Sequence, residues 1–399
     1  MKEGGFLENL SPEEQKRMAY VEGAPFRTSV FEIEKNEGET STEIEKNVVV
    51  VSRDPGSANA LCPVVELLQK EDNIGIKLVT DGRAQQLFQK KFKTKDITPE
   101  GNILEAAGTL SSPDIALIDS SVGEIGIEMF FSATFPEVPV VLVEDYYTSS
   151  VPYLKRLKES NLPFPKKICV IDEGAKDILV KKFPEVADSI EVTGQPSFDR
   201  FAREDTEKIA GDVKKELGIK PEEILVTYMS SAEKNELELI QRLSEELAKV
   251  GKAFKFTYRR HPRDNTSLEQ YEAEIKKRKL DYVRTMDLPT DKIGAASDLV
   301  INTISTEGLN AIYRRKPSIN INDPRFTDPY EDLIPPPSVR LGASAGIEKI
   351  EELADCVKKL LDPESKERKT LDKNMKKNYP LDGKNAKRVE GVLKEVLSK

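Results

Sequence analysis

The stretch Val48-Val49-Val50-Val51-Ser52-Arg53-Asp54-Pro55-Gly56-Ser57-Ala58-Asn59 decides the fold class of this chain. Four consecutive valines are typical of a strand that is covered on both faces of a parallel sheet. The Asp-Pro-Gly triplet that follows favours a tight turn. Apolar residues then recur at helical spacing, at Val64, Val65, Leu67 and Leu68. The stretch therefore predicts a strand, a short turn and a helix, which is the opening of an α/β domain.

The same alternation continues along the chain. In the first half we predict strands at 76–80, 115–119, 138–143 and 168–171, and helices at 84–92, 123–131 and 175–183. After a charged stretch at 203–221, we predict strands at 224–229, 253–258, 282–284, 299–301 and 318–321, and helices at 235–250, 267–277 and 305–314. A last helix is expected at 385–398. Strand and helix in regular alternation indicate parallel sheets with helices on both faces.

The length of 399 residues exceeds one ordinary hydrophobic core and favours two domains. We expect a polar N-terminal arm at 1–46, a Rossmann-like domain at 47–200 and a second Rossmann-like domain at 201–380. Residues 381–399 are expected to form a C-terminal helix that can cross back to the N-terminal domain.

Composition excludes several classes of function. The net charge of −9 argues against general nucleic-acid binding, which favours a basic face. No apolar run approaches the roughly 20 residues of a membrane-spanning helix, so we expect no integral membrane segment. The start of the chain lacks a secretory signal pattern. Three cysteines lie far apart without metal-ligand spacing, at Cys62, Cys169 and Cys356. These features favour a cytoplasmic protein without a metal site.

Polar residues follow the predicted strands of the first half. Gly56 and Ser57 lie in the first turn, where a close backbone approach and free helix amides suit an anion. Four carboxylates follow strands at the same edge, and any of them is a candidate general base: Asp54, Asp119, Glu144 and Asp145. The alternative explanation is that these side chains cap helices or are solvated.

The second half carries a cationic run after the predicted strand 253–258. It contains Arg259, Arg260, His261 and Arg263, and guanidinium groups match the paired oxygens of phosphate. His261 is the chain's only histidine, and the alternative explanation is a packed or surface residue. Ser230 and Ser231 follow the preceding strand, where small hydroxyl residues can hold phosphate oxygens.

A further strand-to-helix junction contains a second set of phosphate-binding candidates. Ser, Thr and Gly at a helix start expose amides that favour phosphate, although an N-cap explains the same pattern. The candidates are Ser305, Thr306, Glu307, Gly308 and Asn310.

The order of these motifs resembles the GT-B glycosyltransferases. The resemblance rests on Val192-Thr193-Gly194-Gln195-Pro196 with Asp199, on His261-Pro262-Arg263-Asp264, on the 305–311 helix start followed by Lys316-Pro317, and on Asp382-Gly383-Lys384 before the last helix. It covers residues 48–398 and is strongest to the UDP-N-acetylglucosamine 2-epimerase, lipid-A-disaccharide synthase and CDP-glycerol transferase branches.

The resemblance implies two Rossmann-like domains with parallel sheets facing a cleft, the nucleotide-sugar donor on the second domain and an unidentified acceptor on the first. It implies that His261 and Arg263 face the donor phosphates, and that Ser305, Thr306 and Gly308 bind phosphate. No cofactor and no metal are implied, because cations and helix termini offset the charge of the leaving group. Asn310 stands where the family commonly has a ribose-binding glutamate, and Glu307 is a possible substitute on the same helix face.

The predicted function is therefore a glycosyltransferase of GT-B type that uses a nucleoside-diphosphate sugar. Two alternatives stay open at this point: an enzyme similar to UDP-N-acetylglucosamine 2-epimerase, and a non-catalytic protein that binds a phosphorylated ligand. The sequence leaves the nucleotide base, the sugar, the acceptor and the oligomeric state open.

Overall fold

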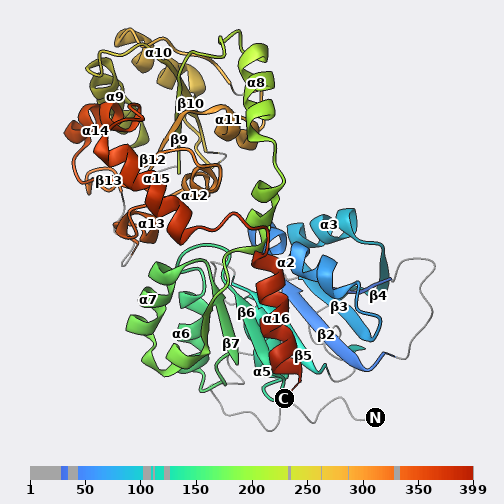
Figure 1. Cartoon of the computed structure of the whole chain (residues 1–399). Helices are drawn as coiled ribbons and strands as arrows, with labels where there is room; N and C mark the ends of the chain where they lie inside the picture. Colours follow the sequence, from blue (N-terminus) through green and yellow to red (C-terminus); the bar gives the residue numbers. More distant parts are fainter. Residues whose placement is uncertain are drawn as a thin grey trace. The chain divides into compact units, whose positions relative to one another are not determined.

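A computed structural model describes residues 28–34, 44–101, 109–110, 113–120, 126–231, 235–261, 263–285, 287–327 and 333–398 (Figure 1). Its fold is α/β, with two sheets of eight and five strands. The chain divides into two compact units. The first comprises 1–145, 149–168 and 389–399, and the second comprises 146–148 and 169–388.

The first sheet has the strand order β4-β1-β3-β2-β5-β6-β7-β8. Its strands are β1 (Thr28–Ile33), β2 (Lys46–Ser52), β3 (Ile74–Asp81), β4 (Thr94–Gly101), β5 (Ile115–Asp119), β6 (Val140–Val143), β7 (Lys167–Val170) and β8 (Ile190–Val192). The intervening helices are α2 (Pro55–Leu68), α3 (Gly82–Lys91), α5 (Ile127–Thr134), α6 (Val151–Glu159) and α7 (Glu173–Lys182). Two 3-10 helices, η2 (Pro184–Ser189) and η3 (Pro196–Ala202), follow α7.

The opening stretch forms the predicted strand, turn and helix. All four valines of β2 are at most 1% exposed, and β2 pairs in parallel with β3 and β5. Pro55 begins α2, where its fixed φ suits the first helical position. Asp54 is the N-cap residue, but its side chain makes no capping hydrogen bond. The carboxylate of Asp54 therefore does not serve as the cap that the alternative explanation assigned to it.

The prediction of a polar arm at 1–46 misses strand β1. This strand runs antiparallel to both β3 and β4, so the first sheet is not parallel throughout. Val30, Phe31 and Ile33 are buried, and their burial explains why a short segment with polar neighbours joins the sheet. Residues 1–27 and 35–43 of the predicted arm lie outside the described residues.

The second sheet has the order β10-β9-β11-β12-β13, and all of its pairs are parallel. Its strands are β9 (Leu225–Met229), β10 (Lys255–Arg259), β11 (Leu299–Asn302), β12 (Ser318–Ile321) and β13 (Ala345–Ile347). Its helices are α8 (Thr206–Glu216), α9 (Glu236–Ala248), α10 (Leu268–Lys277), α11 (Thr290–Ala296), α12 (Thr306–Tyr313) and α13 (Pro337–Arg340). Helices α9 and α10 lie to one side of β9 and β10, and α8 and α11 to the other (Figure 1).

One prediction in this region is wrong, and one helix was not predicted. The strand predicted at 282–284 is a single parallel bridge between Phe256 and Tyr282. The charged stretch 203–221 contains helix α8, whose buried face includes Ala210 and Val213. That face packs in a core cluster with Leu225 of β9 and Ile293 of α11.

The C-terminal part of the chain is helical. It contains η4 (Ile350–Glu352), α14 (Leu353–Leu360), α15 (Lys366–Asn378) and α16 (Asn385–Leu397). The carboxylate of Asp199 accepts hydrogen bonds from the amides of Asn385 and Ala386, each at 2.8 Å, and so caps the start of α16. Cys62 and Cys169 are buried thiols, and Cys356 is half-buried.

Candidate functional site

The carboxyl edge of the second sheet brings most of the predicted residues of this unit together. Strands β9 and β10 end side by side, and the amide of Ser230 donates to the carbonyl of Arg259 at 3.0 Å. The hydroxyl of Ser231 donates to the carbonyl of Ile304 at 2.8 Å. Since Ile304 lies in the turn between β11 and α12, the Ser231 hydroxyl ties the end of β9 to the predicted phosphate-binding turn.

Two arginines of the cationic run are held by the protein itself. Arg259 donates to the carbonyl of Thr285 at 2.6 Å and to the hydroxyl of Thr290 at 2.9 Å. Arg260 donates to the carbonyl of Thr266 at 2.5 Å. Burial also lowers the pKa of Arg259. These bonds shape the turns around the edge, and a phosphate contact of either arginine stays a prediction.

His261 and Arg263 have side chains that are available at this edge. Nδ1 of His261 accepts a hydrogen bond from the Arg263 amide at 3.1 Å, which leaves Nε2 as the nitrogen that carries the proton of the neutral ring. Burial, followed by the charge of Arg263, lowers the pKa of His261. Arg263 is exposed, and its guanidinium makes no hydrogen bond or ion pair with the described residues of the chain. The pair thus offers one neutral donor and one cation.

The loop after His261 is fixed by one carboxylate. Asp264 accepts hydrogen bonds from the Tyr271 hydroxyl and the Thr266 amide, both at 2.8 Å. Tyr271 is fully buried and packs on Tyr258 of β10, with ring centroids 4.8 Å apart. The backbone that carries His261 and Arg263 is therefore held from the core of the unit.

The start of α12 is built tightly. Ser305 is the N-cap, and its hydroxyl accepts from the Glu307 amide at 3.3 Å, whereas Thr306 is exposed. Gly308 lies against the side chain of Asn302. A Cβ at this position would lie 2.9 Å from Nδ2 of Asn302, which is too close, so only glycine fits without a shift. Asn302 in turn accepts a hydrogen bond from Asn320 at 2.9 Å. The glycine therefore allows α12 to pack directly on a buried amide pair below the turn.

Asn310 does not point to open solvent. It is 4% exposed, and its amide donates to Oε1 of Glu307 at 3.0 Å. Burial raises the pKa of Glu307. The two residues that the sequence offered as alternatives for a ribose contact are thus bonded to each other.

A buried ion network beneath α12 was not predicted. The Arg314 side chain is fully buried and donates to both carboxylate oxygens of Glu204, at 2.6 and 2.8 Å, and to Asp291 at 2.7 Å. Arg200 donates to the same oxygen of Asp291 at 3.0 Å. A glycine at 294 admits the Arg314 guanidinium, since a Cβ there would lie 3.1 Å from both Nη1 of Arg314 and Oε2 of Glu307.

The carboxyl edge of the first sheet is acidic and deeply buried. Asp119 ends β5 with no exposed surface, and burial, followed by the charge of Glu128, raises its pKa well above the usual range. Among the described residues neither of its carboxylate oxygens meets a hydrogen-bond partner at normal geometry, and the nearby Ser52 hydroxyl lowers its pKa less than burial raises it. The hydroxyls of Ser52 and Thr80, on the neighbouring strands β2 and β3, are buried without a partner as well.

The other predicted carboxylates of this edge differ in their surroundings. Oδ2 of Asp145 accepts from the Ser57 hydroxyl at 3.2 Å and lies 3.3 Å from the Cβ position of Gly56. Glu144 is 1% exposed and accepts from Ser150 at 2.8 Å, so it is not the solvated residue of the alternative explanation. Sequence reasoning missed Glu128, because it lies inside an apolar helix and follows no strand.

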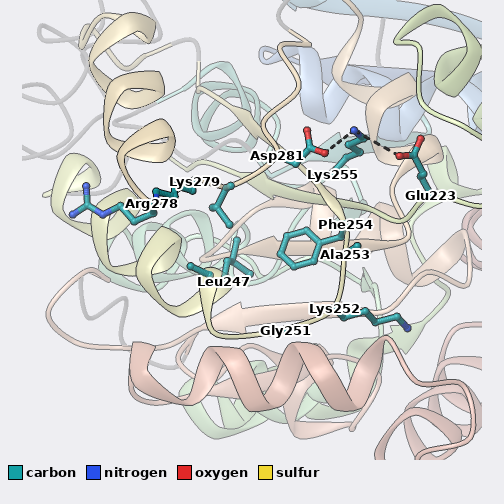
Figure 2. A pocket seen from close by; sticks show the side chains of 12 residues that line it. Glu223, Leu247, Gly251, Lys252, Ala253, Phe254, Lys255, Arg278, Lys279 and Asp281 are labelled. Atoms are coloured by element: carbon teal, nitrogen blue, oxygen red, sulfur yellow. Dashed lines mark hydrogen bonds and ion pairs between the residues drawn. The ribbon is translucent and has the colours of Figure 1, made fainter.

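Two cavities among the described residues lie away from both carboxyl edges. One of about 460 Å³ lies at the amino ends of β9 and β10. Figure 2 shows it lined by Phe254 and Leu247 and by Lys255, which pairs with Asp281 at 2.6 Å and with Glu223 at 3.6 Å. The other, of about 640 Å³, lies beside Glu32, Lys77 and Lys95. Neither contains a residue of the predicted site.

Among the described residues, no group of three or more histidine, cysteine or acidic side chains is arranged to hold a metal ion. Of the helices in the described ranges, none has the length and apolar character that crossing a membrane requires.

Comparison with solved structures identifies the fold. UDP-GlcNAc 2-epimerase from Neisseria meningitidis, bound to UDP-GlcNAc, aligns with a TM-score of 0.60 at 14% identity over 88% of this chain and 99% of its own. The S. aureus MnaA structure with UDP aligns with a TM-score of 0.60 at 14% identity, over 88% of this chain and 97% of its own. A glycosyltransferase from Rickettsia africae aligns with a TM-score of 0.59 at 13% identity, over 89% of this chain and 99% of its own.

The chain has the GT-B fold. This confirms the predicted fold class, two domains with parallel α/β sheets, apart from the antiparallel strand β1. No protein-family model matches the sequence, and no curated protein sequence matches it either. At identities of 13–14% the likeness concerns the fold alone. The activity depends on the residues at the carboxyl edges of the two sheets.

Proposed function

We propose that this protein is a glycosyltransferase of GT-B type that transfers a sugar from a nucleoside diphosphate to an acceptor. The observation that carries the proposal is the carboxyl edge of the second sheet, which brings together Nε2 of His261, the guanidinium of Arg263 and the positive dipole end of α12. The same fold is found in proteins solved with UDP and with UDP-GlcNAc, which supports this choice of donor.

The chemistry assigned to this edge is stabilisation of the leaving group. As the bond between the sugar's anomeric carbon and the phosphate oxygen breaks, negative charge builds on the diphosphate. Arg263 offsets that charge, and neutral His261 donates its Nε2 hydrogen to a phosphate oxygen. The α12 amides add a fixed positive dipole end. These groups are in place before the reaction, so little reorganisation is needed.

The acceptor needs a base, and we assign Asp145 to that role. A general base has to be reachable, and Asp145 is half-buried, whereas Asp119 and Glu144 are almost fully buried. Its Oδ2 accepts from the Ser57 hydroxyl at 3.2 Å, which holds the carboxylate in place. Asp119 fits the opposite role, because its raised pKa keeps it protonated as a hydrogen-bond donor. The acceptor hydroxyl loses its proton to Asp145 as its oxygen attacks the anomeric carbon, and the nucleoside diphosphate leaves.

A 2-epimerase is the second candidate. It needs carboxyl groups that remove and return a proton on one sugar, and the buried Asp119 and Glu128 repel each other's charge, which favours one shared proton. One of the solved proteins with this fold, described as a UDP-GlcNAc 2-epimerase bound to UDP-GlcNAc, supports it. The run Tyr258-Arg259-Arg260-His261-Pro262 differs from the epimerase order His-Arg-Arg-Glu-Asn, which weakens this candidate.

The first experiment is a thermal shift of the protein with UDP, GDP, CDP, TDP and ADP. A nucleotide at 100 times its Kd stabilises by about 2.7 kcal/mol and raises Tm by a few degrees. We expect one nucleotide to act on the wild type and on the control R203A, which removes an exposed arginine outside the site. We expect none to act on the double variant H261A/R263A. An equal shift in the double variant would remove these two residues from the site.

Product analysis with the matching nucleotide sugar then separates the candidates. Transfer predicts that the donor is consumed when an acceptor is added. Epimerisation predicts a second sugar nucleotide from the donor alone. Binding of the nucleotide without consumption of any donor would favour a non-catalytic binding protein and would overturn both enzymatic candidates.

A further inference from the structure

Helix α15 carries a row of lysines on one face. Lysines at 366, 369, 373, 376 and 377 lie within an arc of about 100° at 100° per residue, and all five are exposed. The opposite face holds Leu371 and Met375, which are 4% and 1% exposed. We call these five residues the lysine face. From Lys366 to Lys377 it extends about 17 Å along the helix at 1.5 Å per residue.

Most of the charge of this face is uncompensated. Lys369 pairs with Glu364 at 2.7 Å. Lys366, Lys373, Lys376 and Lys377 have no carboxylate within 4 Å in the described part of the chain. The helix holds six basic and two acidic residues, so its net charge is +4, whereas the whole chain has a net charge of −9. The lysine face is thus a cationic surface on an acidic protein.

Hydrogen bonds hold helix α15 on the side away from the lysine face. Arg315 donates to the carbonyl of Met375 at 3.1 Å and to that of Tyr379 at 2.9 Å, which satisfies the end of α15. Arg368 donates to the carbonyl of Leu360 at 3.0 Å, and Asn374 to that of Gly342 at 3.2 Å. These bonds anchor the far side of α15 and leave the lysine face toward solvent.

We propose that the lysine face docks the protein on an anionic lipid surface. Four or more basic residues on one helix face are typical of attraction to anionic headgroups. The face contains lysine only, a hydrated point charge that suits diffuse surface charge. It lacks the arginines and aromatic side chains with which nucleic-acid-binding proteins form bidentate and stacking contacts. Docking of this kind needs no inserted apolar segment and does not depend on the proposed glycosyl transfer.

The test is co-sedimentation of the full chain with phosphatidylcholine vesicles, alone or with about one third phosphatidylglycerol. Binding is expected only to the anionic vesicles and is expected to weaken with added salt. The test variant is K373Q/K376Q/K377Q. The control K70Q/K90Q/K215Q changes the net charge equally at exposed lysines elsewhere.

Each lysine near an anionic surface strengthens binding about fivefold, so the test variant is expected to bind about 100-fold more weakly than the control. Thermal melting of both variants checks that they fold like the wild type. The proposal is overturned if the wild type ignores anionic vesicles, or if the control loses as much binding as the test variant. Binding of a short duplex oligonucleotide through Lys373, Lys376 and Lys377 without vesicle binding would assign the face to nucleic acid instead.

Discussion

The carboxyl edges of the two sheets are built on opposite principles. The first edge gathers buried carboxylates, and in the described part of the chain Asp119, Ser52 and Thr80 have polar atoms there without hydrogen-bond partners at normal geometry. The second edge gathers cations, and Arg259 and Arg260 are each bonded to backbone carbonyls, although Oε2 of Glu307 and Oδ1 of Asn310 are also buried there without a partner. Unpartnered buried polar atoms cost stability, whereas bonded ones fix geometry.

This difference indicates a division of work. A bonded cationic edge suits an anion whose position must be set before reaction, such as a diphosphate. A buried acidic edge suits proton transfer, because burial moves the pKa of a carboxyl toward neutrality at the expense of stability. The following predictions test whether stability and activity separate between the two edges in this way.

The largest effect on stability is expected in the second unit, in the ion network beneath α12, from R314M. Removing this guanidinium leaves Glu204 buried without its counter-charge and Asp291 with Arg200 alone. The free energy of unfolding should fall by about 3 kcal/mol, the lower end for a broken buried pair because Asp291 is 42% exposed. Urea unfolding measures the loss. The control R200M removes an exposed partner of the same Asp291 and should cost well under 1 kcal/mol.

D119N should separate stability from activity at the first edge. Replacing the unpartnered carboxyl by a neutral amide is expected to keep or raise the free energy of unfolding, while turnover falls by about 100-fold or more. The control D114N keeps an acceptor for the Asn47 amide but loses the ion pair with Lys46 at 3.4 Å, so it should lower stability slightly with turnover unchanged. Equal turnover in D119N and wild type would remove Asp119 from the reaction.

The same carboxyl predicts a pH dependence. Its pKa in the folded protein lies above that of the unfolded chain, so its contribution to stability is present in full below the unfolded pKa. That contribution is lost as the pH rises through the folded pKa. Urea midpoints measured from acidic to neutral pH should therefore fall more steeply for the wild type than for D119N. Parallel curves would contradict the raised pKa.

G308A tests the packing below α12. A Cβ at this position would lie 2.9 Å from Asn302, so Asn302 or the helix must shift, at a cost of about 1–3 kcal/mol. G211A is the matched control, since no atom lies within 4 Å of a Cβ there. In helix α8 the added methyl group should instead stabilise by about 0.5–1 kcal/mol. Thermal unfolding of the two variants should move in opposite directions.

The smallest effect on stability is expected for R263A, below about 0.5 kcal/mol. The residue is exposed, and its guanidinium makes no hydrogen bond or ion pair with the described residues. Its effect should appear in nucleotide binding instead. A large loss of stability in this variant would show that the cationic edge depends on Arg263 for folding, which would contradict the division between the two edges.

Periodicity along the sequence predicted most of the fold, because buried parallel strands such as β2 are continuous apolar runs. It missed β1, whose residues alternate beside polar segments and pair only through distant β3 and β4. The candidate residues do lie at the ends of strands, since the strand pattern determines those positions, and their roles stay predictions. It could not predict the Arg314 network, because Glu204 and Asp291 lie 110 and 23 residues away and look like ordinary surface charges.

The three thiols give this protein built-in reporters of local opening. Cys62 lies in the first unit, and Cys169 and Cys356 lie in the second. Burial raises the pKa of both Cys62 and Cys356 to about 12, so neither is a reactive thiolate in the closed state. A thiol reagent followed by mass spectrometry would therefore record how often each unit opens by itself, and a bound nucleotide should slow labelling only in the unit that holds it.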